Sequence, residues 1–420
     1  MTMLNRRQFG LLSSGLLVPK RLLAAKPPPP PVRPADRKFL FVFNDGGWDT
    51  GYALTPYWSV TDAFIEDEAA PGDVNGIQFV DHPNRPAVRE FFENYGTKTA
   101  LINGVEVQSV THERCRELFL TGQGALQDDW ACVLAGTSPN NLLLPHIVID
   151  GPAFSSRYTS GVVRVGDAGQ LPMLLSGDAL MLSDQSPQSL TLTSESEALA
   201  DAFVEQRTRN RGDTFGNAYN KALDRIDQLK AWDDLNLQVE DKGCERDLVS
   251  DAGLVFDLFE RGLTRTAMMR YRGWCSEGWD THQGLERQDQ NFGDLFEYLN
   301  GIMAELDTRV SDSGAPLSDE VTIIVFSEMG REPRLNSWGG RDHWTFTSLL
   351  MVGSGIQGGQ TIGGLDASGQ GRPVDLGTGV ISDGGASLLP EHIGATLLTL
   401  GDVDPGEFLE GANPISAVLS

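Results

Sequence analysis

The stretch Val321-Thr322-Ile323-Ile324-Val325-Phe326-Ser327-Glu328 decides the fold class of this 420-residue chain. A near-continuous run of β-branched and aliphatic residues is typical of a strand that is buried on both faces of a sheet. In an open α/β sheet, ligands collect beyond the carboxyl ends of the strands. Glu328 stands at that end, so the sequence predicts a functional crevice around it.

Potential metal ligands lie on both sides of this strand in the sequence. Asp280 and His282 form an Asp-x-His pair in Gly278-Trp279-Asp280-Thr281-His282, and Asp342 and His343 are adjacent in Gly340-Arg341-Asp342-His343-Trp344. Carboxylates and imidazoles suit zinc, manganese or iron. The pairs therefore predict a site for divalent metal ions. The alternative is that they are only buried, hydrogen-bonded groups.

Four further runs read as strands, and helical patterns alternate with them. Apolar residues recur at helical spacing over Asn291 to Leu306. Strands that alternate with helices favour an α/β fold with a mostly parallel central sheet flanked by helices. The other predicted strands are Phe39 to Asn44, Thr99 to Asn103, His146 to Asp150 and Ser348 to Val352.

One segment differs from this alternation. From about residue 195 to 250 the chain is charged, helical in period and largely free of proline. We interpret it as a helical insertion packed beside the sheet, with a solvated surface hairpin as the alternative. The rest of 37–420 is expected to form one domain.

The first residues have the order of a twin-arginine export signal. Arg6-Arg7 precedes the short apolar run Leu11 to Val18 and small residues at Ala24-Ala25. We predict a signal peptide over 1–25, a proline-rich tether over 26–36, transfer by the twin-arginine translocation machinery, and a periplasmic or secreted mature protein. A chance basic start is the alternative. The apolar run is too short for a stable membrane anchor.

Charge and cysteine spacing exclude some classes of function. The net charge of −25 argues against generic binding of nucleic acid or anionic lipid. None of the cysteines has Cys-x-x-Cys spacing, so a zinc ribbon or a thioredoxin-like site is not supported, while disulfides are permitted in an oxidising compartment. The cysteines are Cys115, Cys132, Cys244 and Cys275.

Asp45 follows the first predicted strand and begins an Asp-Gly-Gly turn. Two glycines allow a sharp turn, which presents Asp45 at the same edge of the sheet as Glu328. We predict that both are metal ligands. The alternative for Asp45 is a hydrogen bond to its own backbone.

Thr111, His112 and Arg116 are candidates for catalysis because they begin a helix soon after a strand, where a side chain faces the crevice and the helix dipole favours an anion. Arg331 is a candidate for binding an oxyanion, or for pairing with a nearby glutamate. We interpret His82, His146 and His392 as structural residues because each lies beside proline or in an apolar context.

Several of these motifs resemble the DUF1501 family, whose fold is that of the alkaline phosphatase and sulfatase superfamily. The resemblance covers most of the mature chain. It rests on Phe43 to Thr50, Thr111-His112 with Thr121-Gly122, Gly278 to His282, Phe326 to Arg331, Gly339 to Trp344, Gly353 to Gly364 and Ile393 to Thr396.

The resemblance implies a hydrolase scaffold with one or two divalent cations. Asp45 and Glu328 would hold one metal position, and Asp280, His282 and His343 the other. The implied activity is hydrolysis of phosphate or sulfate esters, with a small anionic ester or sugar-derived substrate. A non-catalytic exported binding or scaffold protein of the same fold is the alternative.

The chain departs from the family pattern at two positions. Sulfatases have a region resembling Cys-x-Pro-Ser-Arg before Leu-Thr-Gly, and His112 stands where the nucleophile would be, with Arg116 at the arginine. Cys115 falls at the serine position, so no formylglycine precursor is present there. The strand-end Asp-His pair of phosphatases is replaced by Glu328-Met329, which removes one imidazole.

Overall fold

The computed structural model describes residues 32–122, 128–165, 194–209, 224–225, 228–229, 247–276 and 278–420. The predicted signal peptide, residues 26–31 of the tether and most of the predicted insertion lie outside these residues. Within them, no helix is long and apolar enough to cross a membrane.

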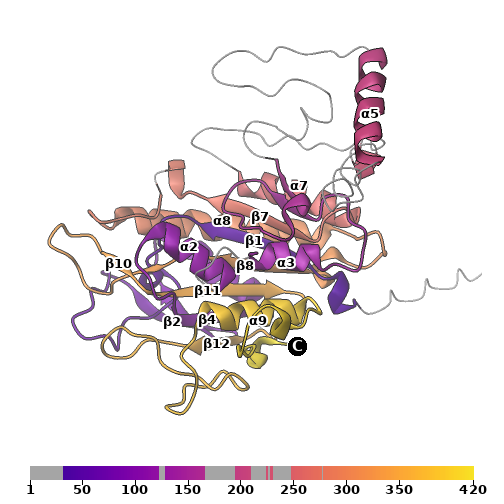
Figure 1. Cartoon of the computed structure of the whole chain (residues 1–420). Helices are drawn as coiled ribbons and strands as arrows, with labels where there is room; N and C mark the ends of the chain where they lie inside the picture. Colours follow the sequence, from indigo (N-terminus) through magenta and orange to yellow (C-terminus); the bar gives the residue numbers. More distant parts are fainter. Residues whose placement is uncertain are drawn as a thin grey trace, which may run out of the picture.

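An eight-stranded sheet forms the centre of the molecule (Figure 1). Its strands run in the order β12-β4-β11-β8-β1-β7-β5-β6, and of these only β11 is antiparallel to its neighbours. The mixed but mostly parallel α/β architecture predicted from the sequence is therefore confirmed. The strand bounds are β1 Lys38–Asn44, β4 Thr99–Glu106, β5 His146–Val148, β6 Val162–Arg164, β7 Thr266–Tyr271, β8 Val321–Phe326, β11 Phe346–Gly353 and β12 Gln360–Gly363.

Helices cover both faces of this sheet. Alternate residues of β1 point to opposite faces, so Leu40 and Val42 belong to one apolar cluster and Phe39, Phe41 and Phe43 to another. The first cluster contains residues of α1, α7 and α8, and the second contains residues of α2, α3 and α9. The bounds are α1 Pro86–Tyr95, α2 His112–Thr121, α3 Trp130–Gly136, α7 Leu248–Glu260, α8 Glu286–Thr308 and α9 Pro390–Leu400.

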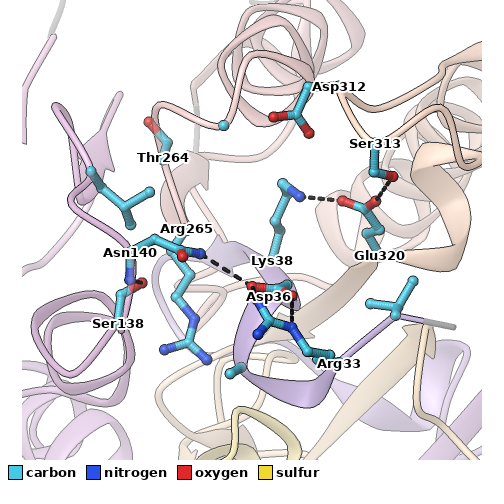
Figure 2. A pocket seen from close by; sticks show the side chains of 14 residues that line it. Arg33, Asp36, Lys38, Ser138, Asn140, Thr264, Arg265, Asp312, Ser313 and Glu320 are labelled. Atoms are coloured by element: carbon cyan, nitrogen blue, oxygen red, sulfur yellow. Dashed lines mark hydrogen bonds and ion pairs between the residues drawn. The ribbon is translucent and has the colours of Figure 1, made fainter. Parts of the chain in front are cut away.

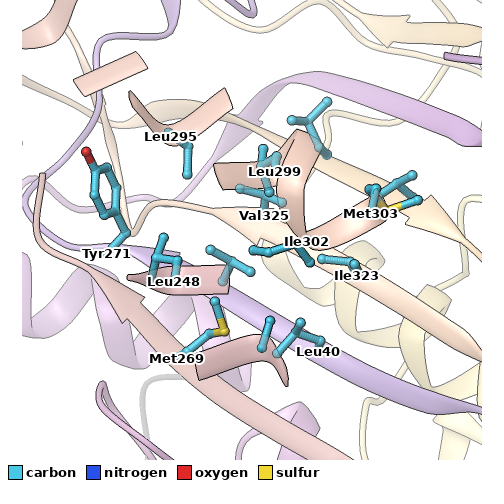
Figure 3. Close-up of a cluster of buried hydrophobic side chains, with 14 of the residues drawn as sticks. Leu40, Leu248, Met269, Tyr271, Leu295, Leu299, Ile302, Met303, Ile323 and Val325 are labelled. Carbon is cyan, nitrogen blue, oxygen red and sulfur yellow. The ribbon is translucent and has the colours of Figure 1, made fainter. Parts of the chain in front are cut away.

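Helix α8 contains the helix that the spacing of apolar residues over Asn291 to Leu306 predicted. Its residues Leu295, Leu299 and Met303 recur every four positions and belong to the same apolar cluster as Val325 of β8, and Figure 3 shows Leu299 beside Val325. The predicted helix Asn291 to Leu306 is thus found, extended at both ends.

The segment Ser194–Arg209 forms α5, which projects away from the sheet in Figure 1. Leu199 and Phe203 on this helix are 73% and 57% exposed. Such exposure is what the solvated alternative for the predicted insertion expects.

Small elements complete the described chain. Two antiparallel ribbons pair β2 with β3 and β9 with β10, and short 3-10 helices connect the larger elements. Their bounds are β2 Ala70–Val74, β3 Ile77–Asp81, β9 Gly330–Arg331, β10 His343–Trp344, η1 Pro34–Asp36, η2 Thr50–Tyr52, η3 Gly96–Lys98, η4 Thr159–Gly161, η5 Trp274–Ser276, η6 Leu317–Asp319, η7 Pro405–Glu407 and η8 Ser416–Val418.

Candidate metal centre at the carboxyl edge of the sheet

Two neighbouring strands place the first groups of the site. β1 and β8 are parallel, and Phe43 lies opposite Phe326 at their carboxyl ends. Asp45 and Glu328, each two residues further on, therefore leave the sheet at the same edge, as the sequence predicted.

The glycine turn after β1 presents amide groups to Glu328. Gly46 and Gly47 have φ angles of 123° and 76°, in the region that favours glycine. The Gly46 amide donates to Glu328 Oε1 at 3.0 Å, the Gly47 amide donates to Oε2 at 3.3 Å, and the Ser327 hydroxyl donates to Oε2 at 2.9 Å. Because the Glu328 side chain is fully buried, these bonds fix where its carboxylate lies.

Glu328 in turn orients His112, the first residue of α2. His112 Nδ1 lies 2.7 Å from Glu328 Oε1, and its Nε2 lies 3.4 Å from Asp280 Oδ2. Hydrogen bonds with Asp280 and Glu328 raise the pKa of His112 to about 9. The imidazole is therefore held between a buried and a half-exposed carboxylate.

Two more histidines have the same arrangement. His282 Nδ1 lies 3.0 Å from Asp342 Oδ1, and His343 Nδ1 donates to the carbonyl oxygen of Val110 at 2.6 Å. A carbonyl or carboxylate oxygen only accepts, so each Nδ1 donates to its partner, and the Nε2 of each ring is left to face the cluster. All these Nε2 atoms face Asp280.

The Nε2 atoms of these two rings converge on one carboxylate oxygen. His282 Nε2 and His343 Nε2 are 3.0 Å apart, and each lies 3.2 Å from Asp280 Oδ1. Donors bound at about 2.0–2.2 Å to one tetrahedral zinc ion lie somewhat more than 3 Å from one another. The spacing of these three donor atoms matches that of ligands on one divalent ion, so the donor set fits a divalent metal.

Arg331 holds the Asp280 carboxylate in place. The buried guanidinium donates to Asp280 Oδ1 at 2.5 Å, to the Gly47 carbonyl at 2.7 Å, to the Arg341 carbonyl at 3.2 Å and to the Gly46 carbonyl. Burial alone would raise the pKa of Asp280, but hydrogen bonds from His112, His343 and Arg331 hold it well below its ordinary value. Arg331 therefore pairs with an acid, as the sequence-based alternative expected, although the acid is Asp280 and not a glutamate.

Asp342 stands at the rim of the cluster. Its Oδ1 also accepts a hydrogen bond from Asn336 Nδ2 at 2.9 Å. The hydrogen bonds of Asp342 with Asn336 and His282 lower the pKa of Asp342. Asp342 positions the His282 ring through Nδ1. The Nε2 atom of that ring faces Asp280.

Three predicted site residues lie beside this cluster. Asp45 accepts from Arg116 at 2.5 Å and from Arg270 at 2.8 Å, so it pairs with arginines outside the histidine cluster. Thr111 is exposed at the N-cap of α2, with its hydroxyl 3.3 Å from that of Ser109.

Some contributors were not found from the sequence. Val110 acts through its backbone carbonyl, which has no residue-type signal. Ser327 directly precedes the predicted ligand Glu328, and that adjacency was the available clue, whereas Asn336 lies six residues before Asp342. Arg270 lies on β7, a strand that the sequence reading did not identify.

The tryptophans and cysteines have mainly structural surroundings. Trp48 and Trp279 are fully buried and pack edge to face, so they belong to the core. Cys115 and Cys132 are free and buried, whereas Cys275 is in a disulfide. Burial raises the pKa of the Cys115 thiol to about 11, which makes it a poor nucleophile at neutral pH.

A pocket opens at the opposite edge of the sheet. It lies beside the amino ends of β1, β7 and β8, at Lys38, Arg265 and Glu320 (Figure 2). Four of its charged groups form ion pairs, Lys38 with Glu320 and Arg33 with Asp36, and Arg265 donates to backbone carbonyls. Nothing there resembles the convergent histidines.

Comparison with solved structures gives distant likenesses. A lipoteichoic acid synthase, LtaP, from Listeria monocytogenes matches at 8% identity and a TM-score of 0.38, covering 91% of this chain and 76% of that one. A protein in the alkaline phosphatase superfamily from Vibrio parahaemolyticus matches at 9% and 0.35, covering 87% and 67%. The PsFucS1 sulfatase from Pseudoalteromonas sp. matches at 11% and 0.36, covering 91% and 72%. No curated protein matches the sequence.

The family comparison is more direct. A family model described as "Protein of unknown function (DUF1501)" matches residues 96–377. These residues include α2, the Asp280 loop, β8 and the His343 ribbon, so most of the histidine cluster lies inside the match. The chain belongs to the DUF1501 family.

Proposed function

We propose that this protein is an exported, metal-dependent hydrolase of phosphate or sulfate esters with the alkaline phosphatase-like fold. The observation that carries the proposal is the convergence of imidazole Nε2 atoms on Asp280, with each Nδ1 held by a carboxylate or carbonyl. Metal-ligating histidines in proteins commonly have this second hydrogen bond, which fixes the tautomer and the ring orientation.

Asp280, His282 and His343 are the proposed ligands, because their donor atoms are 3.0–3.2 Å apart. Three protein ligands leave a coordination position for water or an ester oxygen. A divalent metal at such a position polarises an ester oxygen and lowers the pKa of bound water. Glu328 and Asp45, which the resemblance assigned to another metal position, are engaged by amide, hydroxyl, imidazole or guanidinium donors.

The remaining groups suit proton transfer and anion binding. His112 Nε2 faces the second oxygen of Asp280, and Glu328 holds its ring, so we assign proton transfer to His112. Thr111, exposed beside it, is the candidate nucleophile. Arg116 is only half-buried and can turn from Asp45 to an anionic substrate. Arg331 positions Asp280, since its donors are already engaged by Asp280 and three carbonyls.

The test is turnover by purified protein reconstituted with zinc or manganese. Aryl phosphate, phosphodiester and aryl sulfate are offered in parallel, with a known hydrolase as the positive control. The proposal expects turnover of at least one ester class that is lost on chelation and in Asp280→Ala. Absence of turnover for all three, while the control enzyme is active, would contradict it.

Export rests on the amino-terminal sequence. If Arg6 and Arg7 belong to a twin-arginine signal, replacing both by lysine should retain the chain in the cytoplasm. A fractionation experiment compares this double variant with wild type. Equal periplasmic amounts of the two would contradict export by this route.

A non-catalytic exported binding or scaffold protein is the second candidate. It is favoured by His112 at the nucleophile position and by the fully buried Met329 where the superfamily pattern has an imidazole. This candidate expects metal binding without turnover. If Asp280→Ala also unfolds the chain, the metal is structural.

A further inference from the structure

A second group of potential ligands lies in the core, away from the histidine cluster in sequence and structure. Asp129 is the N-cap of α3, Cys132 is in its first turn, and His146 begins β5. Their exposed fractions are 0%, 1% and 0%. One ligand atom from each lies within 4.8 Å of the others.

The hydrogen bonds of His146 leave one ring nitrogen unused. His146 Nδ1 lies 2.9 Å from the Thr266 hydroxyl and 3.3 Å from the Thr266 carbonyl oxygen. The hydroxyl donates to the Ala131 carbonyl at 3.1 Å, so both oxygens of Thr266 act as acceptors toward the ring. Nδ1 therefore carries the proton, and Nε2 keeps a lone pair.

That lone pair is buried without a partner. In the described chain, His146 Nε2 is one of the few fully buried side-chain atoms with no hydrogen bond. Such atoms are rare in proteins and call for an explanation such as a bound ion. The unpartnered nitrogen belongs to the group that contains Cys132 and Asp129.

Charge gives a second reason for a cation. Asp129 accepts from the amides of Cys132 at 2.7 Å and Phe154 at 2.8 Å, and no lysine or arginine of the described residues forms an ion pair with it. Its neighbour Asp128 is also buried but pairs with Arg157 at 3.0 Å. A buried carboxylate is costly unless it is paired or coordinates a metal.

We propose that Asp129, Cys132 and His146 bind one zinc ion in the core beneath α3. A thiolate, a carboxylate and a neutral imidazole are all ligands that zinc takes. The two negative charges balance a divalent ion, so the buried group becomes neutral as a whole. Ser155, whose hydroxyl hydrogen-bonds to the Cys132 thiol, is placed to add an oxygen ligand.

This zinc site is structural and separate from the proposed hydrolytic centre. All its protein ligands are buried, so no ester substrate reaches it. It connects α3 to β5, two elements that otherwise meet through apolar side chains. His146, interpreted from the sequence as a structural residue, keeps that role here through a metal.

The test is zinc-edge X-ray absorption of the full chain after zinc loading and desalting. The proposal expects a sulfur shell at about 2.3 Å. The ligands proposed for the hydrolytic centre offer only nitrogen and oxygen, so the sulfur shell reports the core site alone. It should persist in Asp280→Ala, where the hydrolytic centre is removed.

Variants of the two free cysteines assign the sulfur. Cys132→Ser, a near-isosteric change, should abolish the sulfur shell and release about one zinc per chain, while Cys115→Ala should leave both unchanged. His146→Gln should also release this zinc and serves if Cys132→Ser does not fold. A wild-type spectrum with only nitrogen and oxygen neighbours, or a sulfur shell that survives Cys132→Ser, would overturn the proposal and leave the hydrolase proposal intact.

Discussion

At the scale of single residues, a buried ion pair holds the loop that carries Asp342 and His343. Arg341 Nη1 lies 2.6 and 2.5 Å from the two carboxylate oxygens of Asp49, and both side chains are almost completely buried. Asp49 also caps η2 by accepting from the Gly51 amide at 3.2 Å. The turn after β1 is thus joined to the loop that ends at the candidate metal centre.

Removing one partner of this pair should be strongly destabilising. Arg341→Met leaves the Asp49 carboxylate buried and unpaired, which typically costs about 3–5 kcal/mol. Urea unfolding measures the change. The exposed pair Arg33–Asp36 is the control, and Arg33→Met should leave stability unchanged within error. Equal effects of Arg341→Met and Arg33→Met would contradict this role of the buried pair.

Two histidines of the cluster should respond differently to substitution. His343→Ala removes a proposed ligand, so bound metal and turnover should both be lost. His112→Gln should keep the metal and lower kcat by about 10²- to 10⁴-fold, because it removes proton transfer. Metal content and steady-state kinetics on the same preparations separate the two roles. Loss of metal in His112→Gln would instead make His112 a ligand.

The residues of the centre were predictable where they follow strand ends. Glu328 was recognised because it follows a predicted strand, and Asp280, His282 and His343 were recognised as parts of Asp/His pairs on either side of that strand in the sequence. The orientation of each ring was not predictable, because it depends on partners such as the Val110 carbonyl. A backbone oxygen has no signature in the sequence.

At the scale of elements, β7 explains the position of Asp45. This strand, Thr266–Tyr271, pairs with β1 and brings Arg270 to Asp45. Its sequence Thr-Ala-Met-Met-Arg-Tyr mixes polar and apolar residues, so the run was too short and too mixed to be recognised. Because β7 was not predicted, Arg270 was missed as a partner of Asp45. The continuous apolar run of β8, by contrast, was sufficient to predict that strand.

Helix α8 joins β7 through a partly buried acid. Asp294 accepts a hydrogen bond from the Tyr271 hydroxyl. Burial raises the pKa of Asp294, while the bond from Tyr271 opposes the rise. A carboxyl whose folded pKa lies above its unfolded value binds protons more readily when folded, so its contribution to stability falls as pH rises through that interval.

Asp294→Asn should therefore stabilise the protein at pH 7, since the amide oxygen still accepts from Tyr271 and no buried charge forms. The gain should shrink towards pH 4. Urea unfolding at both pH values measures it, and Glu297→Gln, an exposed position on the same helix, is the control. A gain of equal size at both pH values, or a loss, would contradict the assigned cause.

At the scale of the whole molecule, the fold class followed from strand and helix periodicity. The reversed direction of β11 within the sheet did not, because strand polarity depends on contacts between β11, β4 and β8 that are remote in sequence. The proposed metal centre lies at the carboxyl edge of this sheet, opposite the pocket at the amino ends of β1, β7 and β8.

The net charge of −25 also acts on the whole molecule. A large excess of one charge destabilises a compact state through self-repulsion, and salt screens it. The free energy of unfolding should rise as sodium chloride increases from about 0.01 to 0.15 M, over which the screening length falls from about 30 to 8 Å. Urea titrations at the two concentrations measure this, and an unchanged or lower value at high salt would contradict it.

The most direct measurement is the metal content of the purified, folded protein by elemental analysis. Wild type is compared with Asp280→Ala, His343→Ala and the exposed-acid control Asp366→Ala. A divalent metal centre at the sheet edge predicts that about one equivalent per chain is lost in both cluster variants and kept in the control. Wild type without metal, or equal metal in all four proteins, would contradict it.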